Sequence, residues 1–278
     1  MKVKETAKIW LDYHKTHSKK NTVRAYKSIL SKVCIELGDT PIHDIAADTI
    51  LSFLNELTNG RKPGTKRVRY AHLSAFFNFI KNDIISDLKN PCDSPMLRKL
   101  FRATTPPYWD FIEKETIDEI IFRTTKIRNR LILELMARGG MRIGEVLKLT
   151  QEDICDRKLI LKDPKSGKEH EIAFIPKRVA ERLKEFAQSV CKNSYDRIFP
   201  ISYEAARVIV AKAGRLVNIK LRPHDLRRHA ATYASRSGVP IEVVSKVILR
   251  HANLSTTQLY LGKISETEAM SWIDNLYR

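Results

Sequence analysis

The sequence is poor in the features of secreted, membrane-bound and metal-dependent proteins. It has four cysteines among 278 residues, and no two of them have the CxxC spacing of a zinc knuckle or a redox pair. No apolar run approaches the roughly 20 residues that a membrane-spanning helix needs, and the N-terminus lacks the apolar stretch of a signal peptide. We therefore expect a reduced, cytoplasmic protein that does not enter a membrane.

Several enzyme signatures are also missing. The chain has no G-x-x-x-x-G-K-[ST] loop for ATP, no G-x-S-x-G turn of a serine hydrolase and no H-E-x-x-H zinc motif. His224, His229 and His251 do not have metal-ligand spacing, and no cysteine or carboxylate cluster joins them. The sequence thus predicts chemistry that uses no metal and no cofactor.

Acidic residues are outnumbered. There are 50 Lys and Arg against 32 Asp and Glu, which gives a formal net charge of +18 and a pI near 9.8. The excess is spread over the chain, with +6 in residues 1–95 and +12 in residues 96–278. Such an excess concentrates nucleic acid and releases its counterions, so we expect a polyanion partner rather than a merely soluble basic protein. A hydrophobic content of 43% is enough for a packed core.

Apolar residues recur at helical spacing through the first 90 residues. The pattern predicts helices over residues 6–17, from a cap at Asn21 to about residue 38, over 47–57 and over about 65–82. The last of these begins with the basic residues Lys66, Arg67 and Arg69. These three either contact DNA phosphates near the positive end of the helix dipole or form a solvated basic face.

Proline then changes the character of the chain. Pro91, Pro95 and the adjacent Pro106 and Pro107 stop helices and stiffen a connection. We place a linker at residues 96–109, between a helical domain of residues 1–95 and a second domain of residues 110–278. The second domain has the pattern of a β-hairpin with strands at 159–162 and 171–175, and of helices at 114–124, 127–138, 177–191, 203–217, 224–237, 241–249 and 265–277. The fold class is therefore mainly α with a small antiparallel β-sheet.

Two segments of the second domain contain arginines suited to phosphate chemistry. Arg142 follows a glycine pair, and Glu145 three residues on either braces its guanidinium or forms an ordinary surface pair. His224 and Arg227 lie three apart on one face of a predicted helix, and the arginine fork suits two phosphate oxygens. We expect both arginines to act on a phosphate rather than on fold stability. His229 lies off that face, so we expect it to pack or to contact backbone.

A third segment supplies a nucleophile. His251 precedes Tyr260 by nine residues, and the Ser and Thr residues between them are suited to cap a short helix that carries the tyrosine. Each signal alone is weak, since a lone tyrosine is usually a half-buried core residue. Together the three segments supply a nucleophile, an anion clamp and proton carriers, which are the parts needed to attack a phosphodiester without a metal.

These segments resemble those of the tyrosine recombinase family, which includes phage integrases and Xer-type recombinases. The similar segments are residues 139–145 (GGMRIGE), residues 223–227 (PHDLR) and His251 with Tyr260. The helical front half is similar to that family's core-binding domain, and an α+β catalytic domain is expected behind it. The resemblance also implies a lysine in the hairpin turn, where Lys165 fits best and Lys168 second. Two positions depart from the family's pattern, Arg250 where glycine is usual and Arg228 where histidine is usual.

The resemblance implies an enzyme that cuts and rejoins DNA at specific sites through a 3′-phosphotyrosyl link. The implied catalytic residues are Arg142, Lys165, His224, Arg227, His251 and the nucleophile Tyr260. The implied partner is double-stranded DNA, on which four copies of the chain form a homotetramer at paired target sites. Accessory DNA-bending proteins are a further partner that the resemblance allows. Integration or excision of a mobile element and chromosome dimer resolution all remain open roles.

Three other functions stay open as alternatives. A type IB topoisomerase uses the same nucleophile as a monomer and relaxes supercoils without paired target sites. A non-catalytic DNA-binding protein would show no covalent step, and a metal-dependent nuclease would lose its activity in EDTA. The C-terminal residues 265–278 carry Ala269, Trp272, Ile273 and Leu276 on one stripe, so this segment either docks on a neighbour or packs on its own domain.

Overall fold

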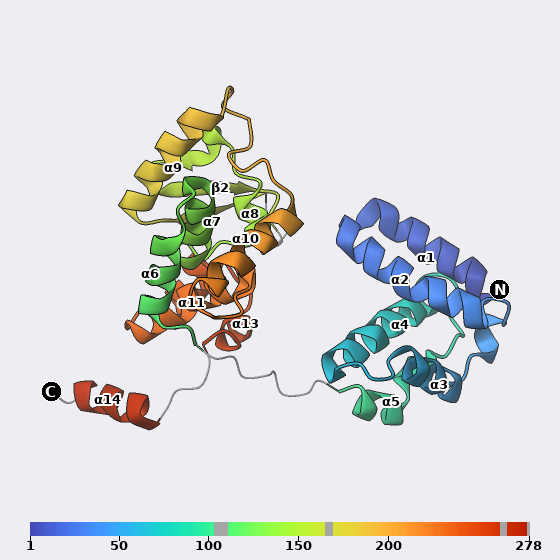
Figure 1. Ribbon diagram of the computed structural model, residues 1–278. Helices are drawn as coiled ribbons and strands as arrows, with labels where there is room; N and C mark the ends of the chain where they lie inside the picture. Colours follow the sequence, from blue (N-terminus) through green and yellow to red (C-terminus); the bar gives the residue numbers. More distant parts are fainter. Residues whose placement is uncertain (103–110, 165–168, 262–265, 277–278) are drawn as a thin grey trace. The chain divides into compact units, whose positions relative to one another are not determined.

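The computed structural model describes residues 1–102, 111–164, 169–261 and 266–276 (Figure 1). Its contacts divide the chain into two compact units, Met1–Pro106 and Pro107–Arg278. Within the ranges just given, no helix is both long and apolar enough to cross a membrane. The described chain is mostly helical and contains a small antiparallel sheet, as predicted.

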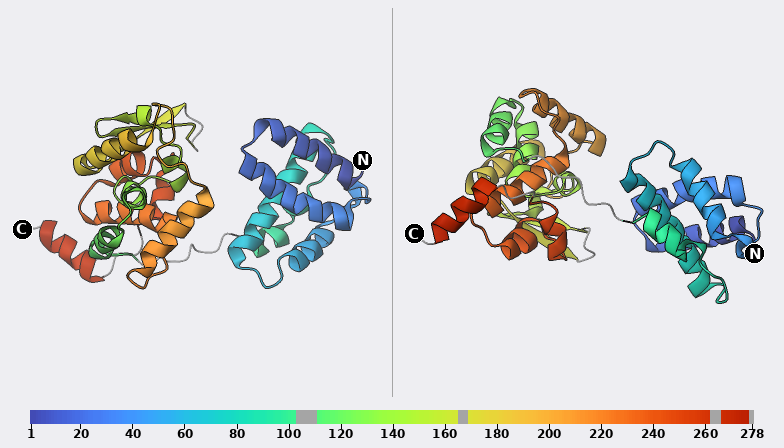
Figure 2. Two further views of the ribbon diagram at one scale, coloured as in Figure 1. Left: turned by 45° about the horizontal axis from the view of Figure 1, so that its top comes forward. Right: turned by 90° about the horizontal axis from the view of Figure 1, so that it is seen from below.

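The first unit is a bundle of helices. Its elements are α1 (Val3–His17), α2 (Lys20–Leu37), α3 (Ala47–Leu57), α4 (Pro63–Asp83) and α5 (Pro95–Leu100), with 3₁₀ turns at Ile42–Asp44 and Pro91–Asp93. Helices α1 and α2 lie side by side (Figures 1 and 2). The apolar stripes that predicted these helices meet in one core, where Trp10, Phe53, Phe76 and Phe77 are fully buried.

Two expectations for the first unit differ from the structure. The predicted cap Asn21 lies inside the first turn of α2, because the Lys19 carbonyl already accepts from the backbone N–H groups of Thr22 and Val23. Residues 96–101, which we expected to begin the linker, form α5 and its end, and Leu97 and Phe101 are buried in the first unit's core. Residues 103–109 of the expected linker lie outside the described residues.

The second unit combines helices with a three-stranded sheet. Strands β1 (Ile154–Cys155), β2 (Lys158–Lys162) and β3 (His170–Phe174) pair in that order, all antiparallel. Strands β2 and β3 are the predicted hairpin, whereas β1 is too short to show a periodic pattern. The helices are α6 (Lys114–Arg123), α7 (Ile127–Ala137), α8 (Ile143–Val146), α9 (Lys177–Val190), α10 (Tyr203–Arg215), α11 (Pro223–Arg236), α12 (Ile241–Val243), α13 (Leu254–Gln258) and α14 (Glu266–Leu276).

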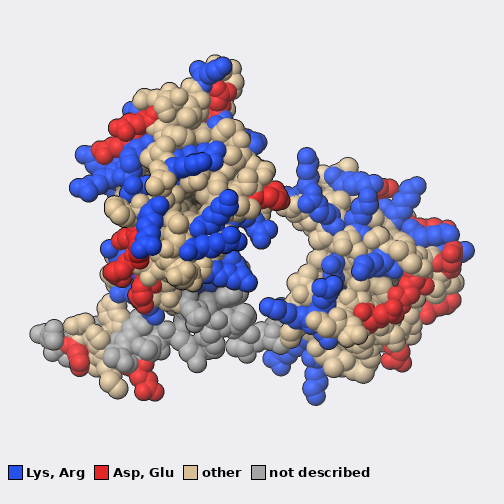
Figure 3. Space-filling model, in the orientation of Figure 1, with Lys and Arg blue, Asp and Glu red and all other residues tan. Residues whose placement is uncertain are grey.

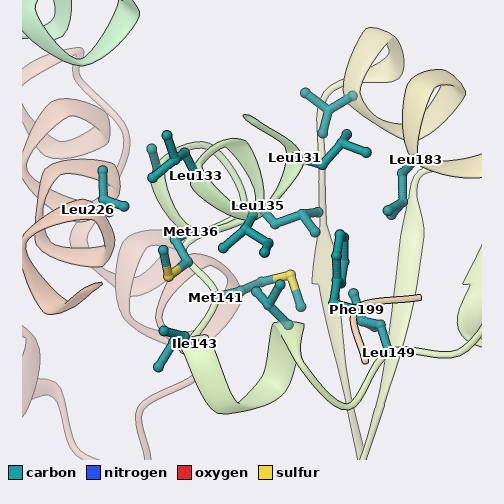
Figure 4. Packing of buried hydrophobic residues seen from close by; sticks show 14 of the residues in the cluster. Leu131, Leu133, Leu135, Met136, Met141, Ile143, Leu149, Leu183, Phe199 and Leu226 are labelled. Atoms are coloured by element: carbon teal, nitrogen blue, oxygen red, sulfur yellow. The ribbon is translucent and has the colours of Figure 1, made fainter. Parts of the chain in front are cut away.

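Helix α7 passes through the middle of the second unit's core. Every residue from Leu131 to Ala137 is buried, and Leu131 and Leu133 point to opposite sides of the helix (Figure 4). Met141, just past α7, points into the same core and is fully buried. The residue after it, Arg142, is therefore held at the edge of a packed region, where its position is well defined.

The segment before His251 is not the continuous α-helix that we predicted for residues 241–249. After α12 the backbone widens into a π-helical turn, Val244–Ile248, in which the Leu249 N–H donates to the Val244 carbonyl at 2.9 Å. The His251 N–H then donates to the Ser245 carbonyl at 2.9 Å. Arg250 between them has a φ of +52°, so the chain reverses sharply. Such π turns recur at functional sites because they re-aim the residues after them.

Candidate active site

The second unit brings five of the six predicted catalytic residues together. Arg142 precedes α8, His224 and Arg227 lie on α11, His251 follows the π turn and Tyr260 follows α13. The Tyr260 ring centroid is 5.2 Å from that of His224 and 5.1 Å from that of His251. The sixth residue, Lys165, and its alternative Lys168 lie in residues 165–168, outside the described residues.

The loop that carries Arg142 depends on a glycine. Gly140 has a φ of +58°, and a Cβ there would come within 2.8 Å of Ile248, so a side chain is excluded both by the conformation and by the space. Arg142 then caps α8, with its backbone N–H donating to Glu145 at 2.9 Å. Its guanidinium donates to the other oxygen of the same carboxylate at 2.6 Å. Glu145 therefore braces Arg142, the first of the two roles that the sequence allowed.

Arg227 is more deeply placed than the sequence suggested. It is 1% exposed, although it is among the largest side chains of the chain. Its guanidinium donates to the carbonyls of Gly140 and Leu249 and lies 3.4 Å from His251 Nε2. Burial lowers the pKa of Arg227, and the neighbouring charges of Arg142 and Arg250 lower it further. Arg227 therefore joins the two loops of the site, which makes it a structural residue as well as a candidate phosphate ligand.

The orientation of His251 is set by a chain of hydroxyl groups. Its Nδ1 lies 3.0 Å from Thr257 Oγ1, which itself donates to Ser245 Oγ at 2.8 Å. Thr257 uses its own proton on Ser245, so we assign the ring proton of neutral His251 to Nδ1. Nε2 is then an acceptor facing Arg227. Burial, together with Arg227 and Arg142, lowers the pKa of His251 to about 4, which keeps the ring neutral near pH 7.

Tyr260 is held between α11 and the π turn. Its hydroxyl lies 2.7 Å from His224 Nε2, and its backbone carbonyl accepts a hydrogen bond from Thr232 at 2.8 Å. Burial lowers the pKa of His224, and Arg228 and Arg227 lower it further. In the neutral tautomer with its proton on Nδ1, His224 accepts a hydrogen bond from the Tyr260 hydroxyl at Nε2. Tyr260 lies two residues beyond α13, whereas we expected it inside a helix capped by the Ser and Thr residues, which instead form the body of α13.

Sequence reasoning missed two contributors to the site, Ser245 and Thr257, which orient His251. It named Arg250 only as a departure from the family's pattern next to His251, and the structure pairs this arginine with Glu145 and Glu171. The sequence offered a signal for Thr257, which lies three residues before Tyr260. It offered none for Ser245, because the π turn places this residue at the site.

The remaining predicted residues lie elsewhere. His229 contacts backbone, as predicted, with its Nδ1 2.9 Å from the Ile112 carbonyl. Lys66, Arg67 and Arg69 lie in the first turns of α4, where Arg67 is exposed and the other two are half-buried. Lys and Arg side chains cover much of the visible surface of each unit (Figure 3). Within the described part of the chain, no three His, Cys, Asp or Glu side chains form a metal-binding group.

Comparison with known families matches both halves of the chain. Residues 110–266 match the model of the phage integrase family, and residues 2–58 match that of the phage integrase N-terminal SAM-like domain. The tyrosine recombinase XerA of Pyrococcus horikoshii is 30% identical over 87% of this chain and 82% of its own. XerA of Pyrococcus furiosus is 31% identical over 87% of this chain and 83% of its own.

Solved structures share the fold. An integrase of the Tn1549 transposon, in complex with a circular intermediate DNA, superposes with a TM-score of 0.76 at 16% identity, over 99% of both chains. A lambda integrase tetramer bound to a Holliday junction superposes with a TM-score of 0.70 at 16% identity, over 91% of this chain and 78% of the other.

Proposed function

This chain belongs to the phage integrase family of tyrosine recombinases, and on that premise we propose how its residues divide the reaction, which intermediate they form and how protomers assemble. The enzyme is a site-specific DNA recombinase that breaks and rejoins DNA. The similarity to curated tyrosine recombinases does not favour the topoisomerase or the non-catalytic alternative.

Tyr260 is the nucleophile. Its oxygen attacks the scissile phosphorus, the P–O bond to the 5′-oxygen breaks, and a 3′-phosphotyrosyl ester remains on the DNA. The observation that carries this assignment is the 2.7 Å contact between the Tyr260 hydroxyl and His224 Nε2, because a neutral imidazole at that distance accepts the phenolic proton as the bond to phosphorus forms.

The two arginines stabilise the phosphorane-like transition state. Arg142 is 28% exposed and presents its guanidinium at the edge of the site, where it binds a non-bridging oxygen. Arg227 binds the phosphate from the buried side of the site and also donates to the Gly140 and Leu249 carbonyls. Charged donors that are already in place act on developing negative charge at little reorganisation cost.

The remaining groups handle protons. His251 accepts a hydrogen bond from Arg227, and an incoming phosphate raises its pKa so that it gains a proton and donates to a phosphate oxygen. Lys165, which lies in the sequence between β2 and β3, protonates the leaving 5′-oxygen, with Lys168 as the alternative. The tyrosyl ester conserves the energy of the broken bond, so a second 5′-hydroxyl reseals it with neither ATP nor a metal.

Replacement of Tyr260 tests this function. Tyr260→Phe should keep DNA affinity and form no covalent complex with a nicked target that traps the intermediate, as read on a denaturing gel. An adduct with the Phe variant would transfer the role to another tyrosine, with Tyr233 on α11, which is 40% exposed, and Tyr277 as the next candidates.

DNA binding and assembly are further parts of the proposal. The net positive charge of both halves supports a clamp in which each unit contacts double-stranded DNA, with Lys66, Arg67 and Arg69 on phosphates. The lambda integrase tetramer on a Holliday junction supports four protomers in strand exchange, aided by accessory DNA-bending proteins where the target requires them.

Helix α14 is the element that we propose docks on a neighbouring protomer. Its apolar residues Met270, Trp272 and Ile273 are all more than 40% exposed, which is costly unless a partner covers them. Ending the chain after Leu261 should leave cleavage of a single site intact and abolish recombination between two sites. Recombination at the native rate by the shortened protein would rule out this role.

A further inference from the structure

Arg250 occupies a backbone position that is unfavourable for a residue with a side chain. Its φ of +52° lies in the left-handed region, where glycine is favoured. Its side chain is nevertheless 4% exposed and turned into the protein. A strained backbone and a buried cation persist together only where the surrounding contacts hold both in place.

Those contacts reach three segments of the site. Arg250 donates to the Ile248 carbonyl at 2.9 Å and to the Gly140 carbonyl at 3.3 Å, the same carbonyl that Arg227 holds. It donates to Glu145 at 2.8 Å. Glu145 therefore lies between Arg250 and Arg142, with one carboxylate oxygen on each guanidinium.

Glu171 on β3 is the second carboxylate that faces Arg250. Its side chain is 7% exposed, and its Oε2 lies 3.6 Å from Arg250 Nε. Neither of these two atoms has a hydrogen-bond partner among the described residues. At 3.6 Å the contact is an ion pair rather than a hydrogen bond. Glu171 thus relies on the charge of Arg250, because a buried carboxylate without a cation is strongly disfavoured.

We propose that Arg250 is a positioning residue which neutralises the buried carboxylates of Glu145 and Glu171 and thereby keeps the charges of Arg142 and Arg227 available to the scissile phosphate. Three arginines and two carboxylates leave one net positive charge in this cluster. Without Arg250 the cluster is neutral, and Glu145 and Glu171 compete with the phosphate for Arg142 and Arg227. This inference rests on the phosphate role proposed above for those two arginines.

The charge balance predicts a rescue. Arg250→Gly relieves the backbone strain and should still slow formation of the covalent complex by about tenfold to a hundredfold, somewhat less than the loss of a direct phosphate donor. Glu171→Gln alone should stay near the native rate. In the double variant the cluster regains one net positive charge, so most of the lost rate should return. The rate of covalent complex formation is measured in single turnover with the full chain at saturating nicked DNA. The Kd for the same DNA and the melting temperature are measured for each variant.

A remote buried ion pair is the matched control. Arg182 on α9 pairs with the buried Glu134 of α7 at 2.6 Å, outside the site. Arg182→Ala should lower the melting temperature and leave the cleavage rate unchanged at a temperature where every variant is folded. Equal slowing by Arg182→Ala and Arg250→Gly would assign the effect to general destabilisation and overturn the proposal.

A second comparison covers the case in which Arg250→Gly is too unstable to assay. Arg250→Lys and Arg250→Gln both introduce flexible side chains, and only the lysine is charged. The lysine variant should cleave about tenfold faster than the glutamine variant, which is a smaller effect than the loss of one charged donor to the phosphate. Equal rates for these two variants, a native rate for Arg250→Gly or no rescue by Glu171→Gln would each overturn the proposal. If Arg142→Ala also cleaves normally, the phosphate role itself fails and this inference fails with it.

Discussion

Arg142 and Arg227 should respond differently to the same substitution. Changing either one to lysine removes a planar fork that lysine cannot replace, so each variant should form the covalent complex about a hundredfold more slowly or worse. Their stabilities should diverge, because Arg227 is 1% exposed, whereas Arg142 is 28% exposed.

The difference in stability arises from the hydrogen bonds. Arg227 holds the carbonyls of Gly140 and Leu249, and a lysine can keep one of them at best. Losing a hydrogen bond to a charged group and leaving a buried carbonyl unpaired costs about 2–3 kcal/mol. For a unit of this size that corresponds to a fall of roughly 5–10 °C in melting temperature. Arg142 has one partly exposed pair with Glu145, which contributes about 0.5 kcal/mol.

The assay pairs thermal unfolding, followed by circular dichroism, with single-turnover cleavage of the nicked target. We expect Arg142→Lys to cleave about a hundredfold more slowly or worse at nearly the native melting temperature, and Arg227→Lys to be similarly slow and also less stable. If Arg227→Lys has the same melting temperature as the native protein, the two carbonyl contacts do not contribute to the free energy of unfolding. If it cleaves at the native rate, the phosphate clamp is wrong.

The remaining predictions concern proton transfer. The Lys165 assignment is tested with a DNA substrate in which sulfur replaces the bridging 5′-oxygen of the scissile phosphate. Because sulfur leaves well without a proton, this substrate should restore cleavage by Lys165→Ala but not by Arg142→Ala. If it restores cleavage by Lys168→Ala instead, the general acid is Lys168. The pKa of His251 is lowered from its usual 6.5 to about 4 in the folded protein, so its neutral form contributes stability above pH 6.5 that is lost as the pH falls toward 4. After discounting for solvent screening of this partly exposed ring, the loss should be about 1 kcal/mol. In urea unfolding at several pH values, the free energy of unfolding should fall more steeply with decreasing pH for the native protein than for His251→Asn. Parallel declines would show that His251 is not the group responsible.

The sequence was sufficient to place most of the helices and the hairpin. Apolar residues at helical spacing form one face that must be buried, so the stripe containing Phe76 and Ile80 predicts α4. The short apolar run at 159–161, followed by a segment rich in Pro, Ser and Gly, predicts β2. A family resemblance joined signals that are weak one by one, and the five candidate catalytic residues that it singled out and that the structure describes lie together. Element ends were less predictable, as at Asn21, because capping depends on which backbone groups are already paired.

Tertiary structure decided what the candidate catalytic side chains contact. The depth of Arg227, the neutral state of His251 and the pairing of Arg250 with Glu145 and Glu171 all depend on residues far apart in the chain. The π turn at Val244–Ile248 shows why local pattern is not enough. Its residues have helical periodicity, yet the turn is widened where it packs against α11, β3 and the Gly140 loop, and Ser245, Arg250 and His251 come to the same site.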